Sequence, residues 1–355
     1  MLSEVTIMDL LRVIMVEILA RLPIKSIFRC KIVCKSWYHL LTSNPLFVKN
    51  YQKRSSSFPS ILLSVNDSVR FIVELKDEND SQSLYRNIEL RPMIHLPSTN
   101  KENLTLVGSC NGFMCLLNGW RNNVDNSVYI SNHLLSEYFK VELPEWEKSF
   151  WNIVYGFGFS EASGQYKVLR FKLAAKNFLG RPKASDLEVY TLGVDEKWRN
   201  AGEVPEPLWR SFNNVNVNGA VHWMDCEKND IIYSFNISTE EVNSLNGQSI
   251  DIWWMKEYGI AESWTKNLIL KDGIQLDIRD DRFIPILIWK DGEILMQRDR
   301  GTQLVSYNPK EKKFKKVKVY NGFGATGYIP SFYSLNTVMG DSFQVSNVYP
   351  KTEIV

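Results

Sequence analysis

The chain has little histidine and cysteine, and it has no long apolar run. Its four histidines stand far apart, and neither Cys30 with Cys34 nor Cys110 with Cys115 has a second ligand pair at zinc spacing. Five cysteines, an odd count without a secretory signal, favour free thiols in a reducing compartment. No apolar run reaches the roughly 18 residues of a membrane span. We therefore expect no metal, no cofactor, no membrane contact, and a cytoplasmic location, a nuclear one, or both.

Recurring catalytic motifs are also missing. The sequence contains no nucleophile elbow, P-loop or dinucleotide fingerprint, and His222 stands in an apolar run beside Trp223, where a packed role is expected. No catalytic residue is therefore predicted, although a site assembled from distant loops would leave no such motif. Six lysines within 310–318 fall between two alternating runs, which favours a solvated hairpin over a nucleic-acid patch.

The N-terminal region, by contrast, has a clear helical pattern. Six apolar residues share one stripe of a 3.6-residue period: Leu10, Leu11, Ile14, Ile18, Leu19 and Leu22. Asp9 is a suitable N-cap for this helix, and Pro23 ends it. A second helix is expected from about Ser26 to Leu41, stopping before Pro45. Helices this short cannot enclose their own apolar faces, so part of that surface must meet a partner or the rest of the chain.

Two motifs within this region carry a family resemblance. They are Leu22-Pro23-Ile24-Lys25-Ser26 and Val33-Cys34-Lys35-Ser36-Trp37, and residues 10–47 around them resemble an F-box of the form common in plants. The resemblance implies that residues 1–50 dock on a Skp-type adaptor and so reach a cullin. The implied adaptor-binding residues are Leu10, Leu11, Ile14, Leu19, Leu22, Pro23, Ile24, Val33, Cys34 and Trp37. Some of these must hold the helices together, and the sequence does not divide them.

The first helix departs from the family pattern, whereas the net charge of the whole N-terminal region fits the family. Leu11 and Val13 replace the usual proline and acidic residue, which predicts weaker adaptor contact. Residues 1–54 hold nine Lys or Arg against three acidic residues, although the whole chain carries only +2. A basic module suits the acidic adaptors of the family. Nucleic acid fits on charge alone but is not expected. Two alternatives stay open: a merely solvated basic face, and a helical cap on the following domain.

After a linker expected at residues 51–59, the pattern changes to short strands. Apolar or alternating runs at 113–117, 166–171, 187–192, 220–223, 284–289 and 304–307 are separated by turn residues. Gly-centred turns recur at steps near 50 residues, with one step of about 73, and 50 residues is the size of a four-stranded blade of the kelch kind. The fold class predicted is mostly β: a small N-terminal helical module followed by a kelch-like β-propeller. A β-sandwich with extra strands is the alternative.

The strand region also carries a family resemblance. Its motifs include Gly108-Ser109-Cys110-Asn111-Gly112, Tyr155-Gly156-Phe157-Gly158-Phe159 and Val217-Asn218-Gly219-Ala220-Val221-His222-Trp223. Residues 60–345 resemble the plant F-box-associated domain, of the S-locus F-box-like kind, with a tail at 346–355. The family's Trp-Asn-Pro-x-Thr turn is here Ile130–Leu135, which predicts a less regular connection. About 25 family residues are missing near 238–251, which predicts a truncated blade with an exposed strand edge.

Together, the two resemblances imply a function. The chain would be the substrate-recognition subunit of a Skp–cullin–F-box (SCF) ubiquitin ligase complex. Its β domain would bind an unidentified target protein for ubiquitination and proteasomal degradation, and the chain itself would be a non-catalytic receptor that acts by proximity. The alternatives are a degenerate or non-ligase F-box protein, and a β-propeller that binds a ligand or glycan.

Overall fold

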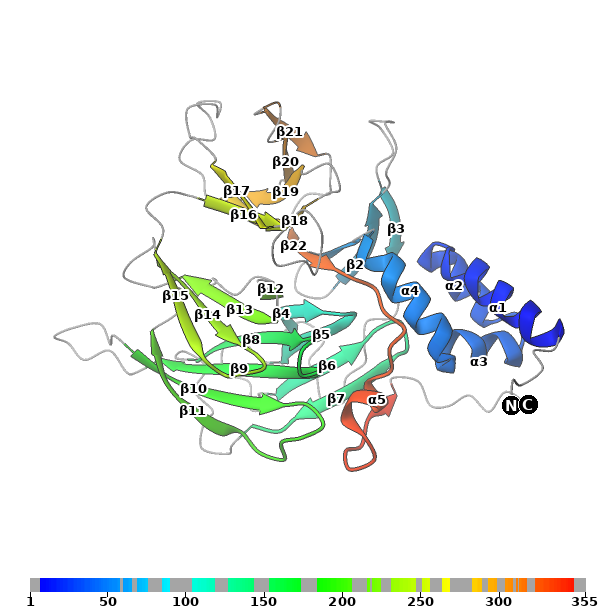
Figure 1. Ribbon diagram of the computed structural model, residues 1–355, viewed down its shortest axis with the longest axis horizontal. Helices are drawn as coiled ribbons and strands as arrows, with labels where there is room; N and C mark the ends of the chain where they lie inside the picture. The colour runs from blue at the N-terminus through cyan, green and yellow to red at the C-terminus, as the bar shows by residue number, and fades with distance from the viewer. Residues whose placement is uncertain are drawn as a thin grey trace, which may run out of the picture.

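Helices and strands occupy separate parts of the chain (Figure 1). The computed structural model describes residues 7–57, 60–65, 69–75, 85–89, 104–118, 127–143, 153–173, 184–205, 216–217, 219–224, 231–246, 251–255, 264–268, 283–288, 293–298, 304–308, 311, 313–317 and 323–347. The helical module comprises α1 (Ile7–Ala20), α2 (Ile24–Lys31), α3 (Lys35–Ser43) and α4 (Pro45–Ser57). Strands follow it, with one later helix, α5 (Leu335–Met339). The expected fold class, helices first and then mostly strands, is confirmed.

In the described part of the chain the strands form six antiparallel sheets. The first sheet has the order β22 (Phe323–Tyr328), β1 (Ser60–Val65), β2 (Val69–Leu75) and β3 (Tyr85–Glu89). The second is β23 (Ser346–Asn347), β7 (Glu137–Val141), β6 (Ser127–Asn132), β5 (Phe113–Asn118) and β4 (Leu104–Cys110). The third is β11 (Arg199–Pro205), β10 (Ala184–Thr191), β9 (Gln165–Leu173) and β8 (Ile153–Ser160).

The remaining sheets follow in sequence order. The fourth is β12 (Asn216–Val217), β13 (Ala220–Met224), β14 (Ile231–Asn236) and β15 (Val242–Asn246). The fifth has two described strands, β16 (Asp251–Met255) and β17 (Trp264–Leu268). The sixth is β18 (Phe283–Ile288), β19 (Ile294–Arg298), β20 (Leu304–Asn308) and β21 (Lys313–Val317). Pairing of β20 with β21 confirms the hairpin expected around the lysine-rich turn.

The sheets follow one another as propeller blades do. Strand β18 lies beside β22, β22 beside β4, β4 beside β8, and β8 beside β12, so edge strands of five of the six sheets are neighbours. The β region also closes on itself, because Tyr328 of the late strand β22 pairs with Ser60 of the first strand. Short strands with tight turns between them explain this topology: apart from the late strands β22 and β23, each sheet is built from strands that are consecutive in the sequence.

Apolar side chains fill the space on both faces of the third sheet. On one face Val168 joins a buried cluster with Phe113 and Leu335. On the other, Phe171 packs edge-on against Trp223 of the fourth sheet, with 5.2 Å between ring centroids. Wide aromatic rings suit the gap between splayed sheets.

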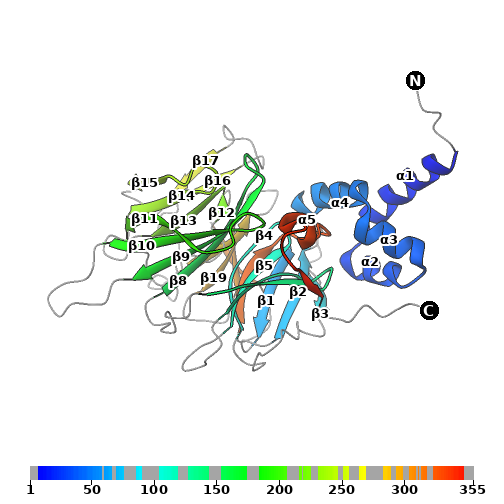
Figure 2. The same ribbon diagram turned by 90° about the horizontal axis from the view of Figure 1, so that it is seen from below.

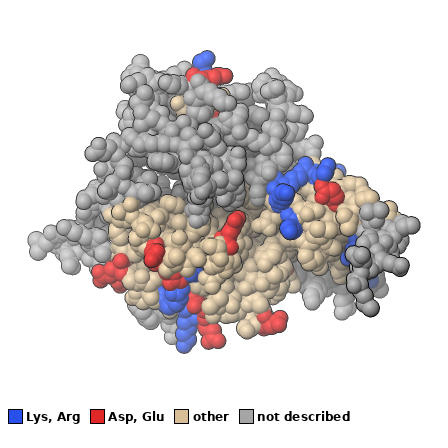
Figure 3. Space-filling model, viewed as in Figure 1, with Lys and Arg blue, Asp and Glu red and all other residues tan. Residues whose placement is uncertain are grey.

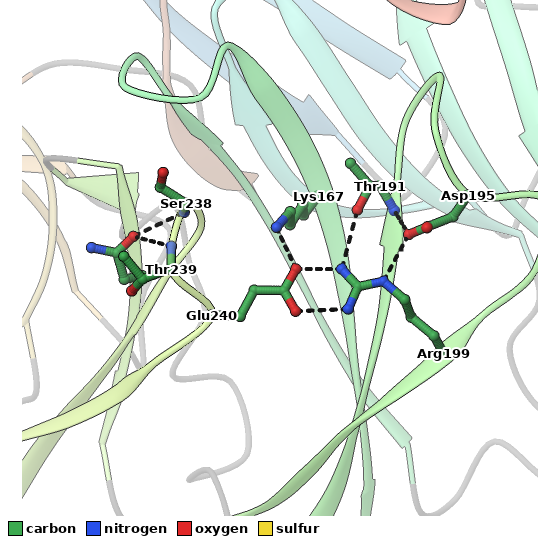
Figure 4. Close-up of polar contacts among 8 residues, drawn as sticks. Lys167, Thr191, Asp195, Arg199, Ser238, Thr239 and Glu240 are labelled. Carbon is green, nitrogen blue, oxygen red and sulfur yellow. Dashed lines mark hydrogen bonds and ion pairs between the residues drawn. The ribbon is translucent and has the colours of Figure 1, made fainter.

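An ion-pair network also joins the third sheet to the fourth (Figure 4). The Glu240 carboxylate, in the turn between β14 and β15, accepts hydrogen bonds from Lys167 Nζ and from both terminal nitrogens of Arg199. Asp195 in turn accepts from Arg199 Nε at 3.2 Å. The Asn236 side chain shapes the turn by accepting from the backbone N–H groups of the two residues that follow Ile237.

Three expected boundaries of the helical module are wrong. Asp9 lies inside α1, which begins at Ile7, so it is not the N-cap. The second expected helix is two helices, because Ile32 leaves helical geometry and Cys34 is extended, at φ −162° and ψ 167°. Residues 51–57 are not a linker. They continue α4, since Tyr51 is buried and extends the helix's apolar face.

Three expectations for the β region also need correction. The sheet that ends at Asn246 is not truncated, because β15 completes its four strands. The two-stranded sheet among the described residues is the next one, β16 with β17. The 130–135 connection is a regular hairpin, in which Asn132 pairs with Glu137. The β domain extends beyond residue 345, since Ser346 pairs with Tyr138.

Candidate functional site: the outer surface of the helical module

The four N-terminal helices share one buried core with the neighbouring sheets. Val16, Leu19 and Ala20 form the inner face of α1, which packs on α4. A hydrogen bond of 3.1 Å from Asn50 Nδ2 to Glu17 Oε2 links the same two helices at the surface. The inner residues lie at i, i+3 and i+4, so burying them turns the opposite side of α1 outward.

The structure divides the ten residues predicted to bind an adaptor. Leu19 and Ile24 are buried, whereas Leu22, Pro23 and Trp37 are half-buried. The exposed members are Leu11, Ile14, Val33 and Cys34. Leu10 lies in α1, but its side chain is outside the described residues. The ten residues therefore include both helix-packing and surface residues, a division that the sequence did not make.

Exposed apolar side chains are concentrated on this module. Of the ten large hydrophobic residues that are exposed among the described residues, eight lie between positions 11 and 46: Leu11, Val13, Ile14, Ile18, Ile32, Val33, Tyr38 and Leu46. Ile32 is 85% exposed and Val33 61%. Soluble proteins expose large apolar groups singly, and a concentration of them marks an interaction surface. We call these eight residues the apolar outer surface.

Sequence reasoning missed several members of this surface. Ile18 belongs to the predicted apolar stripe, and Ile32 directly precedes Val33, so both had a usable signal. Val16, set apart from the stripe, is fully buried. The misassignment arises because α1 is apolar on two sides, and periodicity does not tell which side faces the sheets.

Basic side chains are exposed on the same helical module as the apolar outer surface. Eight of the nine Lys or Arg residues of positions 1–54 are exposed: Arg12, Arg21, Lys25, Arg29, Lys35, Lys49, Lys53 and Arg54. Figure 3 shows Lys and Arg gathered over the helical module on one face of the molecule. Arg21, directly after α1, forms an exposed ion pair of 2.7 Å with Glu17 in the last turn of that helix. An apolar surface on a basic module fits an acidic partner with an apolar contact region.

Lys31 is the exception among these basic residues. Its Nζ points toward the β region and donates a 3.0 Å hydrogen bond to the backbone carbonyl of Leu134. Burial lowers the pKa of Lys31 from 10.5 to about 8, against the opposing effect of Glu137. Lys31 therefore belongs to the contact between the helical module and the second sheet.

Neither a metal-binding cluster nor a membrane-spanning helix is found in the described part of the chain. No three His, Cys, Asp or Glu side chains among them gather closely enough to hold a metal ion. None of the described helices has the length and apolar character needed to cross a membrane. His222 lies in β13, paired with Ser234.

Comparison with known protein families agrees with the two-part architecture. Residues 7–49 match the F-box domain, and residues 60–249 match the F-box associated beta propeller domain. The second match alone covers more than half of the chain. The protein therefore belongs to the family of F-box proteins with an F-box-associated β-propeller domain, as the sequence motifs predicted.

Several curated relatives from Arabidopsis thaliana match nearly the whole chain. The F-box protein At3g07870 is 26% identical, over 86% of this chain and 86% of its own. The F-box protein CPR1 is 23% identical, over 91% and 86%, and the F-box/kelch-repeat protein At3g23880 is 24% identical, over 81% and 87%. Among solved structures, TolB from Acinetobacter baumannii matches with a TM-score of 0.43 and 7% identity, over 81% of this chain and 73% of that one.

Proposed function

We propose that this chain is the substrate-recognition subunit of an SCF ubiquitin ligase complex, acting in the cytoplasm, the nucleus or both. The helical module docks on a Skp-type adaptor and, through it, on a cullin. The β domain holds a target protein. The observation that carries the proposal is the apolar outer surface, because a module already packed on its inner side has no use within this chain for eight exposed hydrophobic residues.

In this role the chain contributes proximity and no chemistry of its own. Docking at one end and target binding at the other raise the local concentration of target lysines around the ubiquitin-charged conjugating enzyme. The acid, base and nucleophile of the transfer then reside elsewhere in the complex.

The proposal is tested by co-precipitating the chain with a plant Skp-type adaptor. Val33 and Val194 are both 61% exposed, but only Val33 lies on the apolar outer surface. Replacing Val33 by Glu puts a charge into the proposed interface, and we expect Val33→Glu to weaken adaptor binding by about 10- to 100-fold. Val194→Glu is the matched control, and it should bind as the wild type does.

Two results would contradict the proposal in different ways. If the folded wild-type chain does not bind any adaptor tested, the protein is a degenerate or non-ligase member of the family. If the wild type binds but Val33→Glu and Ile32→Glu bind equally well, an adaptor is a partner but the apolar outer surface is not its docking site.

A further inference from the structure

The segment after β22 connects the helical module to the β region. We call residues 329–347 the C-terminal strap. Figures 1 and 2 show it leaving β22, passing close to α4 and reaching α5 beside β7. Phe332, Leu335 and Met339 are at most 1% exposed, so these three side chains anchor the strap in the protein's core, although other strap residues are exposed. Its end, β23, pairs with the outer edge of β7.

One side chain of the strap reaches the helical module. The Phe332 ring lies 4.9 Å from the Tyr51 ring and 5.4 Å from the Phe47 ring, centroid to centroid, and both partners belong to α4. Phe47 and Tyr51 also stack on each other at 5.9 Å. These three rings form an aromatic contact between the strap and the last helix of the F-box.

The backbone on both sides of Phe332 is held by the β region. Asn132 Nδ2 donates to the carbonyl oxygens of Ser331, at 3.1 Å, and Tyr333, at 2.8 Å. Asn132 is fully buried, and its own Oδ1 accepts from the Leu134 backbone N–H at 3.0 Å. A single carboxamide at the end of β6 thus holds the carbonyl groups of the two residues on either side of Phe332.

Glu137, at the start of β7, holds the next part of the strap. Its carboxylate accepts from Ser334 Oγ at 2.8 Å, from the Leu335 backbone N–H at 2.7 Å and from Asn336 Nδ2 at 3.2 Å. The turn between Asn132 and Glu137 also receives Lys31 of α2, through the carbonyl of Leu134. This one turn therefore contacts both the strap and the helical module.

We propose that the C-terminal strap and the β6–β7 turn fix the orientation of the F-box relative to the β domain, with Asn132, Glu137 and Phe332 as positioning residues. This inference rests on the proposed function, because in a ligase the fixed orientation decides which lysines of a bound target reach the conjugating enzyme. The strap makes hydrogen bonds to the β region and aromatic contacts to α4. Together these contacts fix both the distance and the relative orientation of the two parts.

The test measures the distance between two spin labels by pulsed electron paramagnetic resonance. One label is placed on Cys34, which is exposed on the helical module, and the other on a cysteine introduced by Val194→Cys in the β region. Cys30 and Cys226 are replaced by Ser. Cys110, which is partly exposed, is replaced by Ser as well, whereas Cys115 stays unlabelled because its side chain is fully buried and burial raises the pKa of its thiol.

We expect one narrow distance in the otherwise wild-type protein and its loss in Phe332→Ala. Phe343→Ala is the matched control. Phe343 belongs to the same strap, but its ring packs at 5.9 Å on Phe139 of the β region, so its truncation should leave the narrow distance unchanged. Phe332→Leu should restore the narrow distance in part, because it refills most of the apolar volume.

Two outcomes overturn the inference. One is a folded Phe332→Ala protein that keeps the narrow distance of the wild type. The other is equal broadening in Phe332→Ala and Phe343→Ala, which would make the effect general loosening. If Phe332→Ala does not fold, Glu137→Gln is measured in its place and must broaden the distance. Adaptor binding is measured separately, so loss of the proposed function would appear as a wild type that does not bind, whatever the distance.

Discussion

Glu240 offers the sharpest energetic prediction for this protein. Its carboxylate lies between Lys167, whose side chain is 3% exposed, and Arg199, whose side chain is 39% exposed. Glu240→Gln keeps the shape of the side chain and removes its charge. The buried Lys167 ammonium would then face a neutral amide, whereas Arg199 keeps Asp195 and partial contact with water.

The magnitude follows from the carboxyl group itself. Hydrogen bonding from Arg199, followed by hydrogen bonding and charge from Lys167, lowers the pKa of Glu240 from 4.5 to about 2. A shift of this size corresponds to about 3 kcal/mol of preferential stabilisation of the charged form. Removing one partner of a buried ion pair costs about 3 to 5 kcal/mol in general. We therefore expect Glu240→Gln to lower the free energy of unfolding by about 3 kcal/mol at pH 7.

The assay is urea unfolding followed by tryptophan fluorescence, repeated at several pH values. Because the folded state has the lower pKa, the contribution of Glu240 is fully present above pH 4.5 and is lost as the pH falls toward 2. The difference between wild type and Glu240→Gln should therefore shrink over that interval. Glu241→Gln is the control, since the Glu241 side chain is exposed and its carboxylate accepts a hydrogen bond of 3.1 Å from the neighbouring hydroxyl of Thr239.

The reasoning fails if Glu240→Gln is as stable as the wild type at pH 7. It also fails if the destabilisation is the same at pH 7 and near pH 2, because the effect would then arise from packing and not from charge. A Lys167→Met, Glu240→Gln double variant separates the pair energy from the single effects, and it should recover much of the loss.

Two further predictions concern the contacts of the turns. In the folded protein the pKa of Lys31 is lowered to about 8, so the unfolded chain keeps this proton to higher pH. The free energy of unfolding should therefore rise between pH 8 and 10.5, by at most about 3 kcal/mol. Urea unfolding of Lys31→Met should lack this rise. Gly193→Ala should lower the melting temperature more than Gly164→Ala does. Both glycines have positive φ, but a Cβ at Gly193 would meet the Val338 carbonyl oxygen at 2.1 Å, whereas the space at Gly164 is open; equal losses would contradict this reading.

The local features of this protein could be predicted from the sequence because they depend on residues that are close together in the chain. The runs at 113–117 and 166–171 became β5 and β9, and the first helix ends at Ala20, close to the proline that was expected to stop it. Family motifs added the blade architecture, which short strands alone leave open between propeller and sandwich.

Errors occurred where a distant contact decides the outcome. Residues 51–57 continue α4 because Tyr51 packs on Phe332 of the strap, and no local pattern reveals that partner. The connection at 130–135 is regular because Asn132, which the sequence places in an atypical turn, bonds to the strap through its side chain. In both cases the stabilising partner lies near the other end of the chain.

The sequence by itself determined that the protein has an F-box and an F-box-associated β domain, since their motifs are contiguous and carry their own turn and helix chemistry. Only the tertiary structure decided which apolar residues of the F-box remain exposed. Leu19 and Leu11 belong to the same predicted stripe, but one is buried against the rest of the protein and the other is 54% exposed. The physical reason is that exposure depends on what covers a face, and here the cover comes from α4, the sheets and the C-terminal strap.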